Sequence, residues 1–231
     1  MLTMSKQRIS KLAFALLLLT FLAVGCASVT SESVELEQSP GVEHPESAGF
    51  RVISREEIDP PVPAYNFSLT DQSGEQISLA DLDGSVVMIT FLYTHCPEAC
   101  PLVAANFRSV QDQMINSIDS KELVQVLVTT DPERDTPERL IRYSQALGGD
   151  WYFLTGTMQD VQEVWDGYDI YREVKERTEE IVVFHSYKTY LIDQNGNLKF
   201  EFVGVWYPED IIPDIQNMLN RNEEINDEKI N

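Results

Sequence analysis

The hydrophobic and polar positions along the chain alternate with different periods in different segments. Residues 85–93 (SVVMITFLY) form an almost continuous apolar run rich in β-branched and aromatic residues, which predicts a strand buried on both faces. Residues 123–129 (LVQVLVT) predict a second core strand, and residues 151–154 predict a third. Shorter runs predict two β-hairpins, one across residues 67–79 around Asp71-Gln-Ser-Gly and one across 187–203 around Asn195-Gly196.

Four segments predict helices. The first is expected from about Pro101 to Asn116, and the next begins at Thr136-Pro137-Glu138, a capping hydroxyl followed by proline and an acid in the first turn. Residues 159–169 and 210–219 predict a short helix and a closing helix. The predicted order, ββ–β–α–β–α–β–α–β–β–α, indicates an α/β fold of the thioredoxin-like kind, with a mixed central sheet flanked by helices.

The first 25 residues are typical of an export signal. Lys6, Arg8 and Lys11 precede an apolar run at 12–25 that is too short to cross ~30 Å of hydrocarbon comfortably. The run ends in AVGC, which resembles a bacterial lipobox, although Ala23 stands where leucine is usual. We therefore expect a lipid on Cys26 that anchors the protein to the outward face of a bacterial cell membrane. An ordinary cleaved signal peptide or a short uncleaved anchor would also place the body outside the cytoplasm.

Composition divides the remainder of the chain into three parts. Residues 26–48 are rich in Ser, Glu and Pro and predict a flexible tether, residues 49–221 a single folded domain, and residues 222–231 an acidic tail that frays. The formal net charge of −21 excludes a nucleic-acid binder, because neutralising phosphates requires Lys and Arg. Solubility is a sufficient explanation for this acidity.

Two cysteines remain once Cys26 is set aside. A bond between Cys96 and Cys100 would close a very small loop and add little stability, so the pair indicates chemistry. It lies between a buried strand and a helix N-terminus, where thiolates are favoured and the pKa of a cysteine can fall to ~3.5–7.5. Three intervening residues allow both sulfurs to converge on one ion and also leave a disulfide possible. Two buried structural thiols are the alternative.

Three histidines are available to complete a site. His44 lies in the predicted tether, and the side chain of His95 should point away from that of its neighbour Cys96. His185 precedes the predicted strand at 187–193, and the loop before that strand lies beside the cysteine loop in a thioredoxin-like sheet. Two thiolates and an imidazole suit Cu(I) and also accept Cu(II) or Zn.

Three motifs in register resemble the Sco/SenC family over residues 61–219. They are YTHCPEACP from Tyr93, TDPERDTPE from Thr130 and HSYKTYLID from His185. The resemblance implies a thioredoxin-fold copper metallochaperone that is anchored in a membrane and serves the dinuclear copper centre in subunit II of cytochrome c oxidase. It implies copper as Cu(I) or Cu(II), Cys96, Cys100 and His185 as ligands, and an upstream copper donor as a further partner.

Two positions depart from the family pattern. Phe184 stands where many relatives have Asp, so the support of His185 should differ, and Leu92 replaces a common Gly. The segment from Asp131 to Asp135 has two interpretations, a turn leading into a capped helix or a role in supporting the site or docking a partner.

The sequence leaves two functions open. The first is copper delivery. The second is thiol–disulfide oxidoreduction, for that subunit's cysteines or in redox defence, with Cys96 attacking and Cys100 resolving. A peroxiredoxin-like peroxidase has weaker support because the cysteines are paired.

Overall fold

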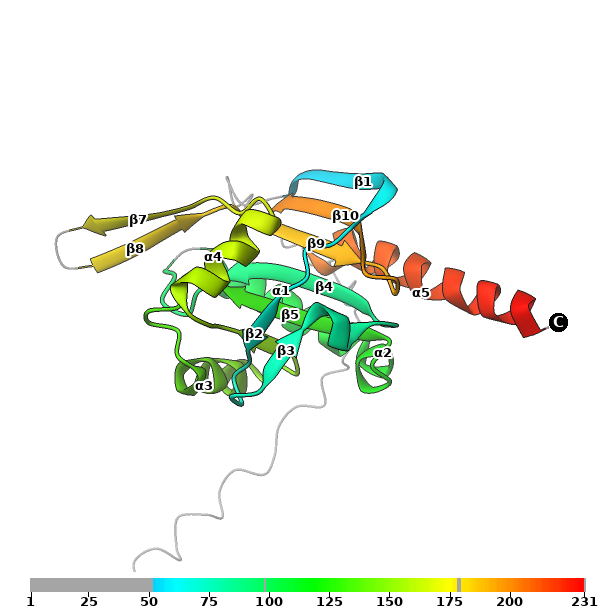
Figure 1. Ribbon diagram of the computed structural model, residues 1–231, viewed down its shortest axis with the longest axis horizontal. Coiled ribbons are helices and arrows are strands. Elements are labelled where there is room, and N and C mark those ends of the chain that lie inside the picture. The colour runs from blue at the N-terminus through cyan, green and yellow to red at the C-terminus, as the bar shows by residue number, and fades with distance from the viewer. Residues whose placement is uncertain (1–51, 98, 178–179, 231) are drawn as a thin grey trace, which may run out of the picture. The chain divides into compact units, whose positions relative to one another are not determined.

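The computed structural model describes residues 52–97, 99–177 and 180–230. Our predictions for the signal peptide at 1–25, the lipid on Cys26, the tether and His44 fall outside the described residues. Six strands form the main sheet, shown in Figure 1. Their spatial order is β1 (Val52–Pro63), β10 (Asn197–Gly204), β9 (Lys188–Ile192), β4 (Val86–Leu92), β5 (Leu123–Thr129) and β6 (Tyr152–Leu154).

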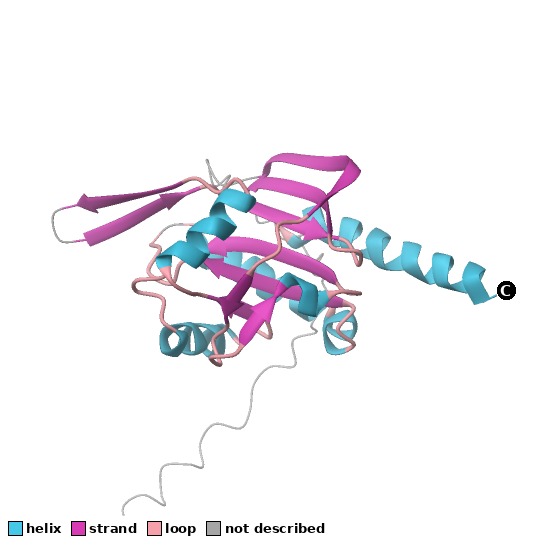
Figure 2. Cartoon of the chain, viewed as in Figure 1, coloured by secondary structure: helices cyan, strands magenta, loops and turns pink. Residues whose placement is uncertain are grey.

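The main sheet is mixed and is covered on both faces, as expected from the continuous apolar runs of β4 and β5. Strands β4, β5 and β6 pair in parallel, whereas the pairs β4–β9, β9–β10 and β10–β1 are antiparallel. Helices flank the strands of this sheet in Figure 2. One core cluster includes residues of α1 (Cys100–Gln113), α3 (Pro137–Leu147) and α5 (Pro208–Ile230). The other includes residues of α4 (Met158–Gly167), β2 (Ser68–Thr70) and the short 3-10 helix η1 (Leu79–Leu82) that follows β3 (Gln76–Ser78). The predicted thioredoxin-like fold is confirmed.

The pairing of β4 brings three loops to one edge of the sheet. Strand β5 runs parallel to β4, with Leu92 beside Thr129, so the segments that follow both strands are neighbours. Strand β9 runs antiparallel to β4, with Thr90 beside Thr189, so the segment that precedes β9 reaches the same edge. The cysteine loop, the Asp131–Asp135 segment and the chain around His185 therefore meet there.

The predicted start of one helix and the predicted hairpin turn are confirmed, although the Thr136 hydroxyl makes no capping hydrogen bond. Helix α3 begins at Pro137 after Thr136, whose extended backbone (φ −72°, ψ 159°) makes it the N-terminal cap residue. In the turn between β9 and β10, Gly196 has φ 77°, a conformation that favours glycine. Asp193 stabilises this turn because its carboxylate accepts the Asn197 N–H at 2.9 Å.

Four features of the fold were missed or differ from prediction. Strand β1 was not predicted, because its prolines and charged residues give no strand pattern, yet an edge strand tolerates both. Strands β7 (Arg172–Arg177) and β8 (Glu180–His185) form a separate two-stranded ribbon that extends beyond the main sheet in Figure 1. Helix α5 continues to Ile230, where a fraying tail was expected. A five-residue helix, α2 (Ile115–Asp119), follows α1. In the described part of the chain, no helix has the length and apolarity needed to cross a membrane.

Candidate metal centre

The cysteine pair lies where the sheet meets a helix. Strand β4 ends at Leu92, and α1 begins at Cys100 itself. The side chain of Cys100 is buried, with 1% of the residue exposed, whereas Cys96 is half-buried in the preceding loop. A hydrogen bond from the Cys96 N–H to the Tyr93 carbonyl at 3.3 Å folds this loop into a turn. No disulfide joins the two cysteines.

His185 faces the buried thiol from the end of β8. Its Nε2 lies 3.7 Å from the Sγ of Cys100, although 85 residues separate the two in sequence. Its Nδ1 lies 2.9 Å from the carbonyl oxygen of Ser186, which can only accept a hydrogen bond. The proton of the neutral ring therefore sits on Nδ1. Nε2 carries the lone pair and points at the sulfur, which is the tautomer that a metal ligand needs.

Burial keeps the imidazole neutral. Loss of hydration lowers the pKa of His185 to about 4, well below its usual value of 6.5. At neutral pH the ring can accept a metal without first losing a proton to solvent.

The pKa of Cys100 moves in the direction opposite to our prediction. Its hydrogen bond with Cys96 raises it most, followed by burial and by the electrostatic influence of a Cys96 thiolate. A position at the start of α1 favours the thiolate, but a second thiol at close range and the lack of water outweigh that effect. The prediction of a low pKa is therefore wrong for Cys100, and a metal ion would have to displace its proton.

The Asp131–Asp135 segment supports the cysteine loop through hydrogen bonds to Thr94. The Asp135 side chain is fully buried and accepts hydrogen bonds from the backbone N–H and hydroxyl of Thr94, two residues before Cys96, and from the Thr129 hydroxyl. Burial raises the pKa of Asp135, while these hydrogen bonds act to lower it. Both the turn interpretation and the supporting role therefore apply to this segment.

His95 does not join the cysteine pair. Its ring is exposed, and Nδ1 lies 3.7 Å from an Asp135 oxygen and 3.2 Å from the Thr94 hydroxyl. The expectation that His95 points away from Cys96 agrees with this arrangement.

Aromatic rings line the other side of His185, and our sequence reasoning did not assign them. The ring of Tyr93 meets that of His185 edge-on at a centroid distance of 6.0 Å, and Tyr187 does so at 5.0 Å. Burial raises the pKa of Tyr93, and the electrostatic influence of Cys96 adds to this effect. Phe184, the residue before His185, has the Lys175 Nζ 5.0 Å from its ring centroid. The adjacency of Tyr93 to the cysteine motif was the signal that could have identified it.

The donor set is soft, and Cys100 contacts both of the other predicted members. Sulfur and imidazole nitrogen suit Cu(I), whereas hard ions such as Mg²⁺ prefer oxygen ligands. Among the described residues, no three His, Cys, Asp or Glu side chains are arranged together as metal ligands. The fold brings His185 and Cys96 each against Cys100, and the assignment of Cys96 as third ligand stays a prediction.

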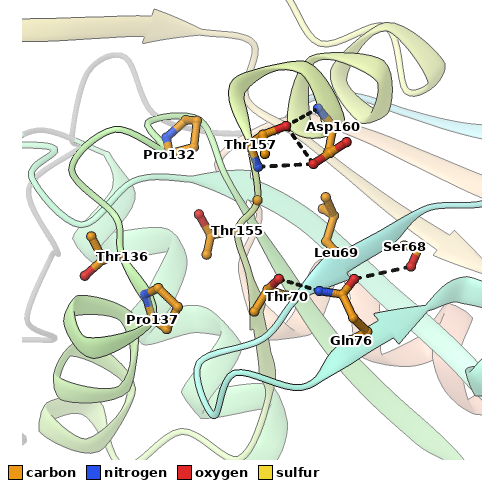
Figure 3. Close-up of a pocket in the computed structure, with 11 residues that line it drawn as sticks. Ser68, Leu69, Thr70, Gln76, Pro132, Thr136, Pro137, Thr155, Thr157 and Asp160 are labelled. Atoms are coloured by element: carbon orange, nitrogen blue, oxygen red, sulfur yellow. Dashed lines mark hydrogen bonds between the residues drawn. The ribbon is translucent and has the colours of Figure 1, made fainter.

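One cavity lies elsewhere and has different chemistry. It has a volume of about 480 Å³ and is lined mainly by hydroxyl-bearing residues and prolines, without cysteine or histidine, as Figure 3 shows. Its lining includes Pro132, Thr136 and Pro137, the outward side of the segment that carries Asp135. It is therefore not the metal centre.

Comparison with known proteins agrees with this geometry. The family profile described as SCO1/SenC matches residues 56–220. The chain belongs to the SCO1/SenC family. The human mitochondrial SCO1 homolog is 32% identical over 141 residues, which are 60% of this chain but only 47% of that protein. The chain thus matches about half the length of this SCO1/SenC relative.

Solved SCO1/SenC structures resemble the chain over about two thirds of its length. Copper-bound ScoI from Bradyrhizobium japonicum is 26% identical, with a TM-score of 0.62 over 68% of this chain and 99% of that chain. A SCO1/SenC family lipoprotein from Bacillus anthracis is 28% identical, with a TM-score of 0.59 over 70% and 98%. BsSco, a cytochrome c oxidase assembly protein of the Sco family with a disulfide switch, is 25% identical, with a TM-score of 0.57 over 71% and 98%.

Proposed function

We propose that this protein binds one copper ion through Cys96, Cys100 and His185 and delivers it to the dinuclear copper centre of cytochrome c oxidase subunit II. The observation that carries the proposal is the 3.7 Å approach of the His185 Nε2 to the Cys100 Sγ, with the lone pair of the ring aimed at the sulfur. The copper-bound relative and the oxidase-assembly relative support the identity of the cargo and of the recipient.

The two sulfurs have different roles in this proposal. Cys100 and His185 are buried and form the fixed part of the site, whereas Cys96 is half-buried in the loop. An incoming thiolate or imidazole from the recipient replaces Cys96 first, because that ligand is the accessible one. Copper then moves by stepwise ligand exchange. Loading Cu(I) releases the thiol protons, so affinity rises with pH.

Anaerobic titration of the reduced full-length protein with Cu(I), in competition with a chromophoric chelator, tests the site. We expect one Cu(I) per chain, at least about tenfold weaker binding in His185→Ala, and greater losses in Cys96→Ser and Cys100→Ser. His95→Ala is the matched control, because that ring is exposed and faces Asp135. A stoichiometry well below one, or equal affinities in His185→Ala and His95→Ala, would exclude the site.

Delivery requires a second experiment. Copper-loaded protein is mixed with the metal-free copper domain of subunit II, and the metal content of each is measured after separation. Transfer to that domain, and none to a version without its copper-binding cysteines, is expected. Copper that stays with the donor would contradict the delivery step.

We also propose that a lipid on Cys26 anchors the protein on the outward face of the cell membrane. The AVGC sequence and the B. anthracis lipoprotein relative support this. Incorporation of a labelled fatty acid that disappears in Cys26→Ser would be expected, and labelling that persists in this variant would refute the anchor.

A thiol–disulfide reductase is the second candidate, and the unequal burial of the two cysteines favours it. The accessible Cys96 attacks a disulfide of the recipient and forms a mixed disulfide with it. Cys100 then attacks the Cys96 sulfur of this mixed disulfide and releases the recipient's thiol. A Cys96–Cys100 disulfide forms as the recipient gains two thiols. BsSco supports a redox role for such a pair. Here His185→Ala should retain function in cells while either Cys→Ser loses it, and loss of function in His185→Ala would favour copper.

A further inference from the structure

We propose that Tyr93 is the positioning residue that holds His185 in register with the cysteine pair, an inference that rests on the proposed copper site. Tyr93 follows the last residue of β4 and is 2% exposed. Its carbonyl oxygen accepts the Cys96 N–H at 3.3 Å, and its hydroxyl oxygen accepts the Val183 N–H at 3.3 Å. One residue therefore holds both the loop that carries the cysteines and the strand that carries the histidine.

The bond to Val183 acts on His185 through the geometry of β8. Val183 and His185 are two residues apart on one strand, so their side chains lie on the same face and their backbone groups point to the same edge. The opposite edge of β8 pairs with β7, where Val183 lies opposite Val174. Fixing the Val183 N–H from the side of the cysteine loop thus fixes the distance between that loop and the imidazole.

The hydrogen bond that the His185 ring makes with backbone does not set this distance. The bond from Nδ1 goes to Ser186, which is the next residue and moves with the histidine. On the same edge of β8, Arg134 Nη1 donates to the Ile181 carbonyl at 3.1 Å, two residues further from the site than Val183. The Arg134 guanidinium also lies 5.8 Å from the centroid of the Tyr93 ring, on its face. Arg134 therefore packs over the ring and limits its movement.

The ring of Tyr93 restricts the imidazole directly as well. It meets the His185 ring edge-on at 6.0 Å and leaves the imidazole little freedom to rotate away from Cys100. Val183 is only 4% exposed, so its N–H would lack a partner if the hydroxyl were removed. Strand β8 would then move toward water. His185 would have to be brought back beside Cys100 each time copper binds, which lowers the affinity for copper.

The test is Tyr93→Phe, which keeps the ring and removes the acceptor. Tyr168→Phe is the control, because it also removes a hydroxyl that bonds to backbone: the Tyr168 hydroxyl donates to the Tyr65 carbonyl at 3.0 Å, but Tyr168 belongs to the other core cluster. In the Cu(I) competition assay on the full-length protein we expect about tenfold weaker binding for Tyr93→Phe, the size of one buried hydrogen bond, and wild-type affinity for Tyr168→Phe.

A double-mutant cycle separates alignment from a general structural effect. In the His185→Ala background, Tyr93→Phe should cause no further loss, because no imidazole remains to be aligned. In Cu(II)-loaded Tyr93→Phe, electron paramagnetic resonance should show a weakened nitrogen coupling while the thiolate-to-copper absorption persists. In wild type, amide hydrogen exchange at Val183 should be slow with and without metal.

The outcomes distinguish this inference from the function on which it rests. Failure of the wild type to bind one Cu(I) overturns both. If the wild type binds and His185→Ala weakens binding, the proposed copper site stands. The role of Tyr93 is then overturned by equal affinities in Tyr93→Phe and Tyr168→Phe, by an equal loss in the His185→Ala background, or by fast exchange of the Val183 amide in wild type.

Discussion

The Asp135 carboxylate and Thr94 are joined by two hydrogen bonds, from the threonine hydroxyl at 2.6 Å and from its backbone N–H at 3.1 Å. The same hydroxyl oxygen accepts from the Arg139 Nε at 2.9 Å, so α3 also holds Thr94 in place. Because Thr94 lies two residues before Cys96, this arrangement ties the cysteine loop to the end of β5. The acidic segment between β5 and α3 thus shapes the site without contacting a metal.

Removing this carboxylate should destabilise the protein. Asp135→Ala leaves the buried donors of Thr94 and Thr129 without their acceptor, and we expect the free energy of unfolding to fall by about 3 kcal/mol. Urea denaturation of the metal-free protein measures it. Asp112→Ala is the control, because this half-exposed carboxylate pairs with Arg108 one helical turn away, and it should cost less than about 0.5 kcal/mol. Equal losses in the two variants would contradict the supporting role of Asp135.

The two thiols should differ strongly in reactivity. Cys96 is half-buried in a loop, whereas Cys100 is 1% exposed and its pKa is raised, so fewer thiolates form there. With iodoacetamide at pH 8, we expect Cys96 to be alkylated at least about tenfold faster than Cys100. Peptide mass spectrometry of time-quenched samples follows both sites, and the two rates should converge in denaturant. Faster modification of Cys100 in the folded protein would be incompatible with the structure.

Burial of His185 predicts a pH-dependent stability. Its pKa is about 4 in the folded protein and near 6.5 when unfolded. Between these values the unfolded chain binds a proton that the folded protein does not, so the free energy of unfolding falls as pH decreases from 6.5 to 4. His185 alone contributes about 3 kcal/mol to this fall, and its contribution to stability is fully present above pH 6.5.

Urea denaturation of the reduced, metal-free protein at several pH values checks this contribution. His185→Asn should lose less stability on acidification than wild type, because it has no imidazole to protonate. His95→Asn, which alters an exposed ring, is the comparison. The same pH dependence in wild type and His185→Asn would show that His185 is not the buried neutral group described here.

A buried amide in the core should be replaceable with a gain in stability. Gln125 is 1% exposed, and its Nε2 donates to the Phe107 carbonyl, but among the described residues no donor reaches its Oε1. We expect Gln125→Met to raise the free energy of unfolding by about 1 kcal/mol, because a buried polar atom without a partner is removed.

Gln111 provides the matched control for this substitution. It is also buried, but its Oε1 accepts the Asp150 N–H at 2.7 Å, so Gln111→Met should destabilise the protein by about 2 kcal/mol. Thermal denaturation of the two variants compares them directly. A loss of stability in Gln125→Met as large as that in Gln111→Met would show that the Gln125 amide is fully satisfied in solution.

Local sequence determined the parts of this protein whose causes are local. The apolar run of β4 is long and β-branched, the Thr136-Pro137 pair starts α3, and the Asn195-Gly196 turn closes a hairpin, because each depends on near neighbours in the chain. The types of residue in the candidate site were also readable, since two cysteines and a histidine define a soft donor set wherever they lie.

The edge strand β1 and the β7–β8 ribbon could not be predicted from local sequence. Strand β1 is stabilised by its pairing with β10 and not by its own composition, which includes prolines and many charges. Strand β7 (REVKER) is almost wholly charged and β8 (EIVVFH) is mostly apolar, and each is only six residues long, too short a signal to separate from a loop. Strand pairing depends on residues far apart in sequence, so a single segment does not reveal it.

Only the tertiary structure decided how the donors meet and how they ionise. The antiparallel placement of β9 beside β4 brings His185 to Cys100, and the parallel placement of β5 brings Asp135 to Thr94. The raised pKa of Cys100 follows from a neighbouring thiol and from exclusion of water, neither of which the helix start signal contains. Sequence specifies the chemical groups, whereas distance and hydration, which set their reactivity, exist only once the sheet has assembled.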